Sequence, residues 1–260
     1  MYAFGVEPNW LERTVTQVKL PCKGLTSGVR ILHLSDLHAS LSVPFSLIES
    51  AVELGLGAKP DVICLTGDYV TDATPIDGAE YAGILRRLSS AAPVFATLGN
   101  HDGGAWGASV DGLKDTSIVR ALLHQSNIPV LHHRSELVRV RDQAVRVAGV
   151  PDLWSEPIDV DRAFANVPAN DLVILLAHNP DTKDVLADRP WDLMLSGHTH
   201  GGQVVLPVLG ERFVPVRDKR FVAGLKQWEG RQIYVTRGVG SIDGVRVNCR
   251  PEVTVLDLAS

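Results

Sequence analysis

Five short apolar runs, each followed at once by polar residues, constrain the fold of this chain more than any other feature. The runs are Val29–Leu34, Val62–Leu65, Val94–Leu98, Leu172–Ala177 and Leu193–Leu195. Apolar runs of this length that are bounded by turn residues are typical of buried β-strands. Helical periodicity separates the first three runs, because Phe45–Leu56 and Ala79–Leu88 each place apolar side chains on one face. Strands that alternate with helices predict βαβ units and therefore an α/β fold.

The second half of the chain has a different pattern. We predict two antiparallel hairpins and a terminal strand: Leu137–Val140 with Ala144–Val150, Phe221–Trp228 with Gln232–Thr236, and Val253–Leu258. No repeat or linker interrupts the 260 residues, a length that suits one α/β domain. We therefore expect a single domain over residues 1–260, with two packed sheets and flanking helices.

Composition excludes several classes of protein. Hydrophobic residues make up 45% and charged residues 21% of the chain, which is typical of a globular protein. The net charge of -5 provides no overall basic field, so we expect no nucleic-acid partner. The chain has no apolar run of about 18 residues and its start does not resemble a signal peptide. We expect a cytoplasmic or membrane-associated protein.

Seven side chains of metal-ligand type follow the ends of the predicted strands. They are Asp36, His38, Asp68, Asn100, His178, His198 and His200. In open α/β sheets, functional groups gather beyond the carboxyl ends of the strands. Two pairs share an i, i+2 spacing, which in an extended segment points both side chains to one side. Oxygen and nitrogen donors without thiolate favour manganese, iron or zinc, and the histidine content argues against magnesium or calcium.

Each of these residues, taken singly, also has an ordinary structural explanation. Asp36 could cap a helix, Asp68 and Asn100 could lie in turns, and His178 could be a hydrogen-bonded residue at a strand end. Their joint placement at apolar strand ends favours a metal site. A carboxylate such as that of Asp68 can bridge two ions, and each ion would then have four protein ligands. His33, inside the first run, is expected to be buried.

Five sequence blocks together resemble the calcineurin-like metallophosphoesterases. The blocks are Asp36-x-His38, Gly67-Asp68, Gly99-Asn100-His101-Asp102, His178 and Gly197-His198-Thr199-His200. They occur in the order that is typical of the family. The surrounding residues resemble a bacterial, membrane-associated phosphodiesterase branch that includes relatives acting on UDP-2,3-diacylglucosamine. The resemblance extends over nearly the whole chain, except for the N-terminal anchor that members of this branch often carry.

The resemblance implies a four-layer α/β/β/α sandwich of two mixed sheets flanked by helices. It also implies two divalent transition-metal ions with a shared aspartate. The first ion would be held by Asp36, His38, Asp68 and His200. The second would be held by Asp68, Asn100, His178 and His198. His101 would face the substrate phosphate, and Asp102 would orient His101.

The expected reaction is hydrolysis of a phosphodiester or pyrophosphate bond, on a lipid-linked or nucleotide-sugar substrate and with peripheral membrane association. Two cations about 3.5–4 Å apart can share a water and supply hydroxide that attacks phosphorus. His101 would serve as general acid or as a phosphate ligand, and the sequence does not choose between these roles. A phosphomonoesterase would share all seven ligands, whereas a non-catalytic binding module would be expected to lack some.

Three further features stay open. Trp106 and Trp154 would either line the mouth of the site or belong to the core. The basic run at residues 217–220 would be a phosphate contact or a solvated loop. Three cysteines fit neither a disulfide framework nor a CxxC site, and a bridge between Cys22 and Cys249 stays an alternative.

Overall fold

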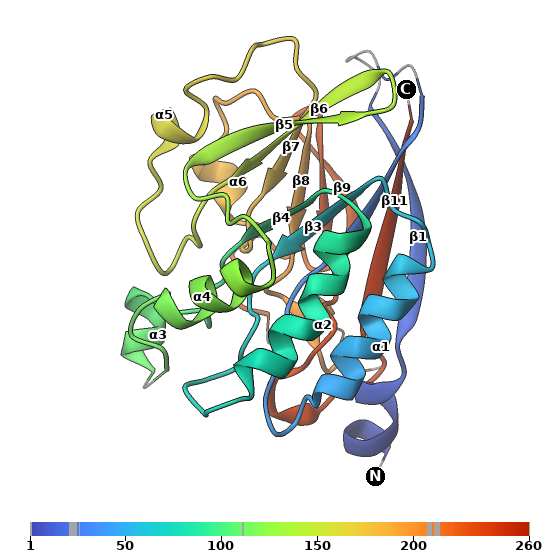
Figure 1. The fold of residues 1–260 in the computed structure, drawn as a ribbon, viewed down its shortest axis with the longest axis vertical. Helices are drawn as coiled ribbons and strands as arrows, with labels where there is room; N and C mark the ends of the chain where they lie inside the picture. The colour runs from blue at the N-terminus through green and yellow to red at the C-terminus, as the bar shows by residue number, and fades with distance from the viewer. Residues whose placement is uncertain are drawn as a thin grey trace.

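Two β-sheets lie face to face in the computed structural model, with helices on the outer face of each (Figure 1). The structure describes residues 2–20, 25, 27–110, 112–206, 210 and 214–259. The first sheet has the strand order β1-β11-β2-β3-β4. Its strands are β1 Glu12–Lys19, β11 Glu252–Ala259, β2 Val29–Leu34, β3 Val62–Thr66 and β4 Val94–Thr97. Both parallel and antiparallel pairs occur within it, so the sheet is mixed.

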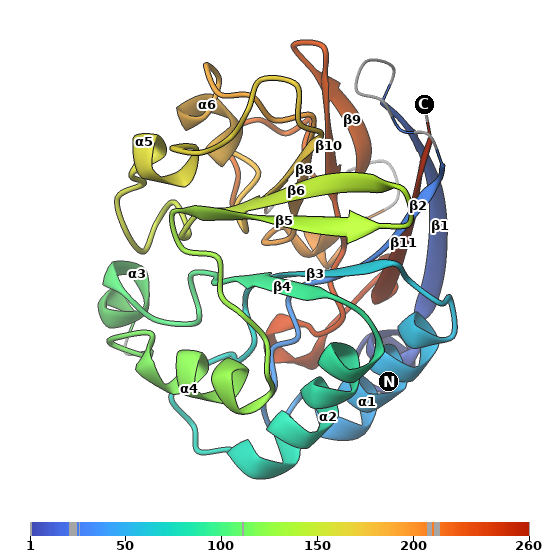
Figure 2. The same cartoon turned by 45° about the horizontal axis from the view of Figure 1, so that its top comes forward.

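The second sheet has the order β5-β6-β7-β8-β10-β9 and is also mixed. Its strands are β5 Arg134–Val140, β6 Gln143–Gly149, β7 Val173–Leu176, β8 Leu193–Ser196, β10 Arg231–Val235 and β9 Gly224–Trp228. Figure 2 shows the two sheets as separate layers. The α-helices are α1 Phe45–Leu56, α2 Gly78–Ala91, α3 Ala105–Ser109, α4 Ser117–Gln125, α5 Val160–Ala163 and α6 Thr182–Val185. Shorter helical turns span Tyr2–Val6, Glu7–Asn9, His200–Gly202 and Ile242–Gly244.

Alternation of side chains along the strands builds three apolar layers. On β2, Ile31 points between the two sheets, whereas its neighbour Leu32 points to the side covered by α1 and α2. A third layer lies under α5 and α6 and contains Trp191. Full burial of a side chain such as Ile31 or Leu32 contributes roughly 1.5–3 kcal/mol to stability. The expected four-layer α/β/β/α sandwich is therefore confirmed.

Several predicted elements agree with the structure closely. The first predicted strand and the first predicted helix have the same bounds as β2 and α1. Both predicted hairpins are antiparallel pairs, β5 with β6 and β9 with β10. Sequence analysis did not identify β1, which pairs with β11 at the edge of its sheet. Val15 on β1 is 56% exposed, so this strand carries little of the apolar signal that marks a buried one.

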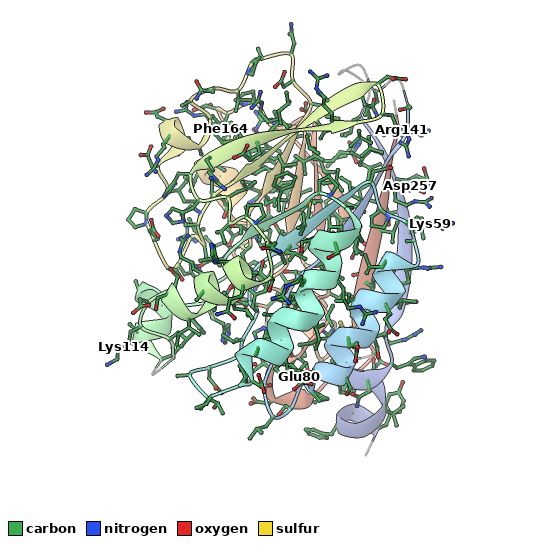
Figure 3. The ribbon with its side chains drawn as sticks, in the orientation of Figure 1. Lys59, Glu80, Lys114, Arg141, Phe164 and Asp257 are labelled. Carbon is green, nitrogen blue, oxygen red and sulfur yellow. The ribbon has the colours of Figure 1, made fainter. Side chains whose placement is uncertain are left out.

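The carboxyl ends of β2, β3, β4, β7 and β8 place the polar residues identified above in one region. The opposite end of β2 carries a separate polar group, where Lys59, Arg141 and Asp257 lie close together (Figure 3). Ion pairs join Arg141 to Asp61 and Arg30 to Asp257 there. Among the described residues, no helix is both long enough and apolar enough to cross a membrane.

Candidate metal centre

Five of the seven metal-type residues have a left-handed backbone. The φ angles are 51° at Asp36, 47° at His38, 55° at Asp68, 69° at His198 and 51° at His200. Such angles are uncommon for residues other than glycine, and strained residues of this kind cluster at functional sites. The prediction that the i, i+2 pairs lie in extended segments is therefore wrong. Hydrogen bonds between segments hold the first pair, because the amides of Asp36 and His38 donate to the carbonyls of Gly67 and Asp68, each at 2.9 Å.

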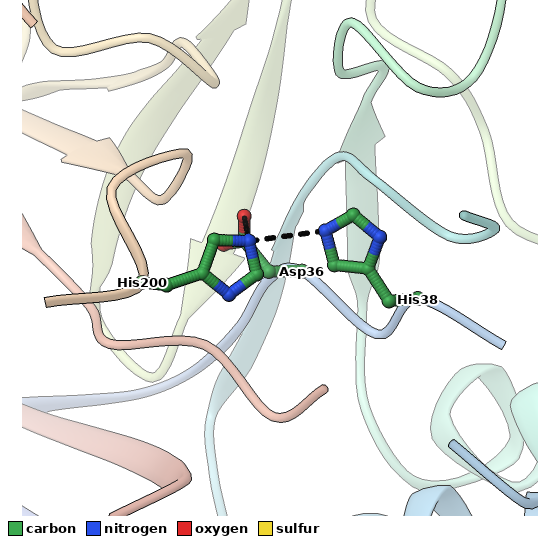
Figure 4. Close-up of side chains that lie close together, drawn as sticks. All are labelled: Asp36, His38 and His200. Carbon is green, nitrogen blue, oxygen red and sulfur yellow. Dashed lines mark hydrogen bonds and ion pairs between the residues drawn. The ribbon is translucent and has the colours of Figure 1, made fainter. Parts of the chain in front are cut away.

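A first group of side chains consists of Asp36, His38 and His200 (Figure 4). The Nε2 atoms of His38 and His200 are 3.1 Å apart. The His200 Nε2 atom is 3.4 Å from Asp36 Oδ1. Asp36 and His38 follow β2 and His200 follows β8, so the two sheets contribute jointly to this group. The three side chains are buried and can converge on one cation.

A second group consists of Asn100, His178 and His198. The His198 Nδ1 atom lies 2.8 Å from Asn100 Oδ1 and 3.3 Å from His178 Nε2. Asp68 stands between the two groups, because its Oδ2 atom is 3.1 Å from His178 Nε2 and 3.5 Å from His38 Nε2. The structure therefore brings all seven predicted residues together.

Hydrogen bonds to carbonyl groups orient the imidazole rings of the second group. His178 Nδ1 lies 2.6 Å from the Thr66 carbonyl oxygen, and His198 Nε2 lies 3.1 Å from that of Pro215. A carbonyl only accepts, so each of these nitrogens donates, which leaves the other ring nitrogen to face the cluster. Metal-ligating histidines commonly show this arrangement. The donor set and its orientation thus fit a divalent transition-metal ion.

Burial controls the protonation of the cluster. It lowers the pKa of His38 and His198 to about 3 and also holds the pKa of His200 well below its usual value, so these rings are neutral. Burial also opposes charge on Asp68 and His178, but their mutual attraction is stronger. It holds the pKa of Asp68 low and that of His178 high. A ligating imidazole is neutral, so an ion bound beside Asp68 would replace the His178 proton as the partner of the Asp68 carboxylate.

His101 and Asp102 differ from expectation in one respect. The His101 Nδ1 atom lies 2.6 Å from the Thr71 carbonyl oxygen, which fixes the ring beside His38. The Asp102 carboxylate accepts instead from the backbone amides of Asp68, Tyr69 and Gly99, at 2.7–2.8 Å. Asp102 therefore holds the turns that follow β3 and β4, and Thr71 orients His101. No residue pattern in the sequence marked Thr71, because a carbonyl contact does not depend on residue type.

Two tryptophans lie against the cluster. The Trp106 ring is centred 4.4 Å from that of His101, and the Trp154 ring 4.5 Å from that of His198. Of the two interpretations left open by the sequence, these contacts favour the mouth of the site. In the basic run, Arg220 is paired with Asp218 at 2.6 Å, so a phosphate contact there stays a prediction. Cys249 is buried, and Cys22 lies outside the described residues, so their pairing is untested.

Another cluster with metal-type side chains has a different explanation. His132 and His133 both approach Glu156 Oε1 through Nε2, at 3.0 and 3.4 Å. On the far side of each ring, Nδ1 faces a donor, the Arg120 guanidinium for His132 and the Asp159 amide for His133. Both Nε2 atoms therefore carry hydrogen and donate to Glu156. These hydrogen bonds account for the cluster without a metal, and they join residues 132–133 to the turn that contains Trp154.

Comparisons with known proteins agree with this geometry. The calcineurin-like phosphoesterase family model matches residues 29–202, which contain all seven metal-type residues. Phosphodiesterase YaeI of Escherichia coli is 42% identical over 258 residues, which cover 99% of this chain and 92% of that protein. UDP-2,3-diacylglucosamine pyrophosphatase LpxG of Chlamydia muridarum is 27% identical over 304 residues, which cover 98% of this chain and 92% of that protein.

A solved structure shows a similar fold at low sequence identity. The NAD nucleotidase of Haemophilus influenzae matches with a TM-score of 0.52 and 15% identity, over 82% of this chain and 45% of that one. This likeness concerns the fold alone, whereas the family model and the relative with 42% identity concern the sequence. On these grounds the chain belongs to the calcineurin-like phosphoesterase family and is a metal-dependent hydrolase of phosphate esters.

Proposed function

We propose that this chain hydrolyses a phosphodiester or pyrophosphate bond with two divalent ions that share Asp68. Asp36, His38 and His200 would complete the first site, and Asn100, His178 and His198 the second. The position of Asp68 Oδ2, within 3.1 Å of one group and 3.5 Å of the other, carries this proposal. The absence of thiolate from this donor set supports manganese, iron or zinc as the ions. Elemental analysis of the purified protein tests both the number and the identity of the ions.

The bound ions would lower the pKa of a water molecule and offset the charge that grows on the phosphoryl oxygens. The other tasks fall to the residues of the chain. Because His101 donates through Nδ1 to the Thr71 carbonyl, its Nε2 atom is available to the substrate. To act as general acid, the ring must be an imidazolium that gives its Nε2 proton to the leaving oxygen. A neutral His101 would only accept hydrogen bonds through Nε2 and could not protonate the leaving group.

The preference for a diester or pyrophosphate is supported by the names of two relatives, a phosphodiesterase and a UDP-2,3-diacylglucosamine pyrophosphatase. A nucleotide-sugar substrate with a lipid part is therefore the first class to test. The decisive assay compares bis(p-nitrophenyl) phosphate, p-nitrophenyl phosphate and UDP-2,3-diacylglucosamine with the manganese-loaded protein. Faster cleavage of the monoester than of both other substrates would overturn the proposed preference.

We also propose that the protein associates with a membrane surface through its N-terminal segment. Tyr2, Phe4 and Trp10 are 50%, 66% and 51% exposed, and tryptophan and tyrosine favour membrane interfaces. Leu41, which is 94% exposed, lies between His38 and α1. Figure 1 shows the N-terminus near the start of α1. This arrangement would bring the metal centre close to a lipid-linked substrate.

Co-sedimentation with anionic vesicles tests the membrane proposal. A Phe4→Ser, Leu41→Ser double variant should sediment less than the unaltered protein. Val15→Ser is the matched control, since Val15 is 56% exposed but lies within β1. Equal sedimentation of the double variant and the unaltered protein would contradict the proposal.

A further inference from the structure

The two tryptophans at the metal centre come from different parts of the chain and form one aromatic surface. Trp106 lies on α3, and Trp154 lies on the turn that follows β6. Their ring centroids are 6.4 Å apart and the ring planes differ by 30°. One ring contacts His101 and the other contacts His198. The aromatic surface therefore borders both the proposed acid and a proposed metal ligand.

Backbone contacts hold the two tryptophan-bearing segments together. The Ala105 amide donates to the Ser155 carbonyl at 3.1 Å, which joins the start of α3 to the turn after β6. Figure 2 shows this turn next to α3. The backbone at Gly104 has a φ of +91°, and a Cβ there would lie 3.0 Å from the Ser155 carbonyl oxygen. The close approach of the two segments thus depends on glycine at position 104.

The rest of the Trp154 turn is also anchored. The Trp154 amide donates to Asp152 Oδ1 at 2.9 Å. Glu156 accepts from His132 and His133, as described above. The turn is therefore fixed on both sides of the tryptophan, while Trp154 as a residue is 38% exposed. A fixed and half-exposed aromatic ring is pre-organised for binding and loses little conformational entropy when a ligand stacks on it.

A second tryptophan pair shows what a core arrangement looks like in the same molecule. The rings of Trp191 and Trp228 are stacked with centroids 5.6 Å apart and planes 7° apart, and the residues are only 2% and 9% exposed. Trp106 and Trp154 do not cover each other in this way, and neither belongs to a core cluster among the described residues. Trp154 is 38% exposed, so a ligand can reach this part of the aromatic surface.

We propose that Trp106 and Trp154 form a binding subsite for an aromatic ring carried by the phosphate ester, of the kind that a nucleobase supplies. This inference rests on the proposed function, because it assumes that the phosphate lies at the metal centre. A group attached to that phosphate and directed towards His101 and His198 meets the two indoles. A flat ring gains from stacking on one exposed face, whereas an acyl chain gains mainly from enclosure.

A pocket with a mostly apolar lining lies elsewhere and could receive an acyl chain. A pocket of about 420 Å³ lies between residues 70–78 and α4, and its lining includes Val70, Ile76, Leu113 and Ile118. Thr71 directs its hydroxyl to His38, whereas its neighbours on both sides line this pocket. The pocket is therefore on the far side of the Thr71 segment from the metal centre. An acyl chain in this pocket would not depend on the tryptophans.

Binding of two matched phosphates to the zinc-loaded protein tests the subsite without requiring turnover. Adenosine 5′-monophosphate and ribose 5-phosphate share the phosphate and the sugar, and only the former has an aromatic ring. Calorimetry should give a lower Kd for the nucleotide. Trp154→Ala should reduce this preference by about five- to a hundredfold, the range expected when one stacking partner of a base is removed. Trp154→Phe should retain most of it, and the core variant Trp228→Phe should leave the ratio unchanged.

Equal affinity of the unaltered protein for both phosphates would overturn the subsite. An equal weakening of both by Trp154→Ala would overturn it as well. If octyl phosphate, included as a third ligand, alone loses affinity in Trp154→Ala, the occupant is a chain and the aromatic assignment is wrong. Failure of the proposed function has a separate signature. The protein would then keep its preference for the nucleotide but hydrolyse neither diesters nor pyrophosphates in the metal-loaded state.

Discussion

The two halves of the metal centre are similar in geometry but differ in charge. The half with Asp36, His38 and His200 contains a carboxylate of its own, whereas the half with Asn100, His178 and His198 contains a neutral amide. Asp68 lies between the two halves, so the first half has one more carboxylate than the second. Among the described residues, an exposed tryptophan contacts the second half, where Trp154 lies against His198. If each half binds one ion, as proposed, we expect the first half to hold its ion more tightly than the second.

The largest effect is expected from removing Asp68, the residue proposed to be shared by the two halves. Asp68→Ala should lose both ions and reduce hydrolysis to background, because each half loses a ligand and the carboxylate between them. Elemental analysis and a diester assay measure the two effects. Asp61→Ala is the control, since Asp61 is paired with Arg141 at the opposite end of β2 and should leave both ions in place. Retention of two ions by Asp68→Ala would show that the two halves do not share this ligand.

His101 contacts the ring of His38 but is assigned to neither half. We expect His101→Ala to keep both ions while its turnover falls by roughly 10²–10⁴-fold, the range for a lost general acid. The loss should be far greater for an alkyl phosphodiester than for a p-nitrophenyl ester, because nitrophenolate leaves without a proton. Steady-state kinetics on both substrates measure the difference. Equal losses would indicate that His101 only positions the phosphate, and loss of an ion would place it among the ligands.

The charge difference itself can be removed by a single substitution. Asn100→Asp gives the second half a carboxylate and should tighten its hold on the second ion on the order of tenfold. Competition with a chelator during loading measures this change. The isosteric reverse substitution, Asp36→Asn, should instead lower the affinity of the first half for its ion. If neither substitution changes the metal affinity, charge does not distinguish the two halves.

Local pattern explains why the metal-type residues could be predicted from the sequence and their conformations could not. Asp68 and His198 follow short apolar runs that are visible in the sequence, and strand ends of a parallel sheet meet at one edge. Their left-handed backbones depend on hydrogen bonds from distant segments, such as the Asp102 carboxylate accepting from the Asp68 amide. The same applies to Trp106 and Trp154, whose pairing arises only when α3 meets the turn after β6.

The smallest expected effect is on the pH dependence of stability, and it comes from a buried histidine that belongs to neither half. His33 lies on β2, where Nε2 is 2.8 Å from the Thr66 hydroxyl and Nδ1 is buried without a hydrogen-bond partner. Burial lowers the pKa of His33 to about 3, against roughly 6.5 in the unfolded chain. The folded state therefore binds the proton less readily than the unfolded state. The contribution of the neutral His33 side chain to stability is complete above pH 6.5 and is lost progressively as the pH falls towards 3.

A His33→Gln variant separates this contribution from the acid sensitivity of the metal centre, because glutamine keeps hydrogen-bonding groups but does not titrate. Below pH 6.5, the free energy of unfolding should fall more steeply for the unaltered protein than for His33→Gln. The two slopes should differ by up to about 1.4 kcal/mol per pH unit. Denaturant titrations of both proteins after the same chelator treatment measure the two slopes between pH 7.5 and 4. Since both proteins keep the seven metal-type residues, acid effects on the cluster cancel in the comparison. Parallel slopes would mean that His33 takes up its proton equally in the folded and unfolded states.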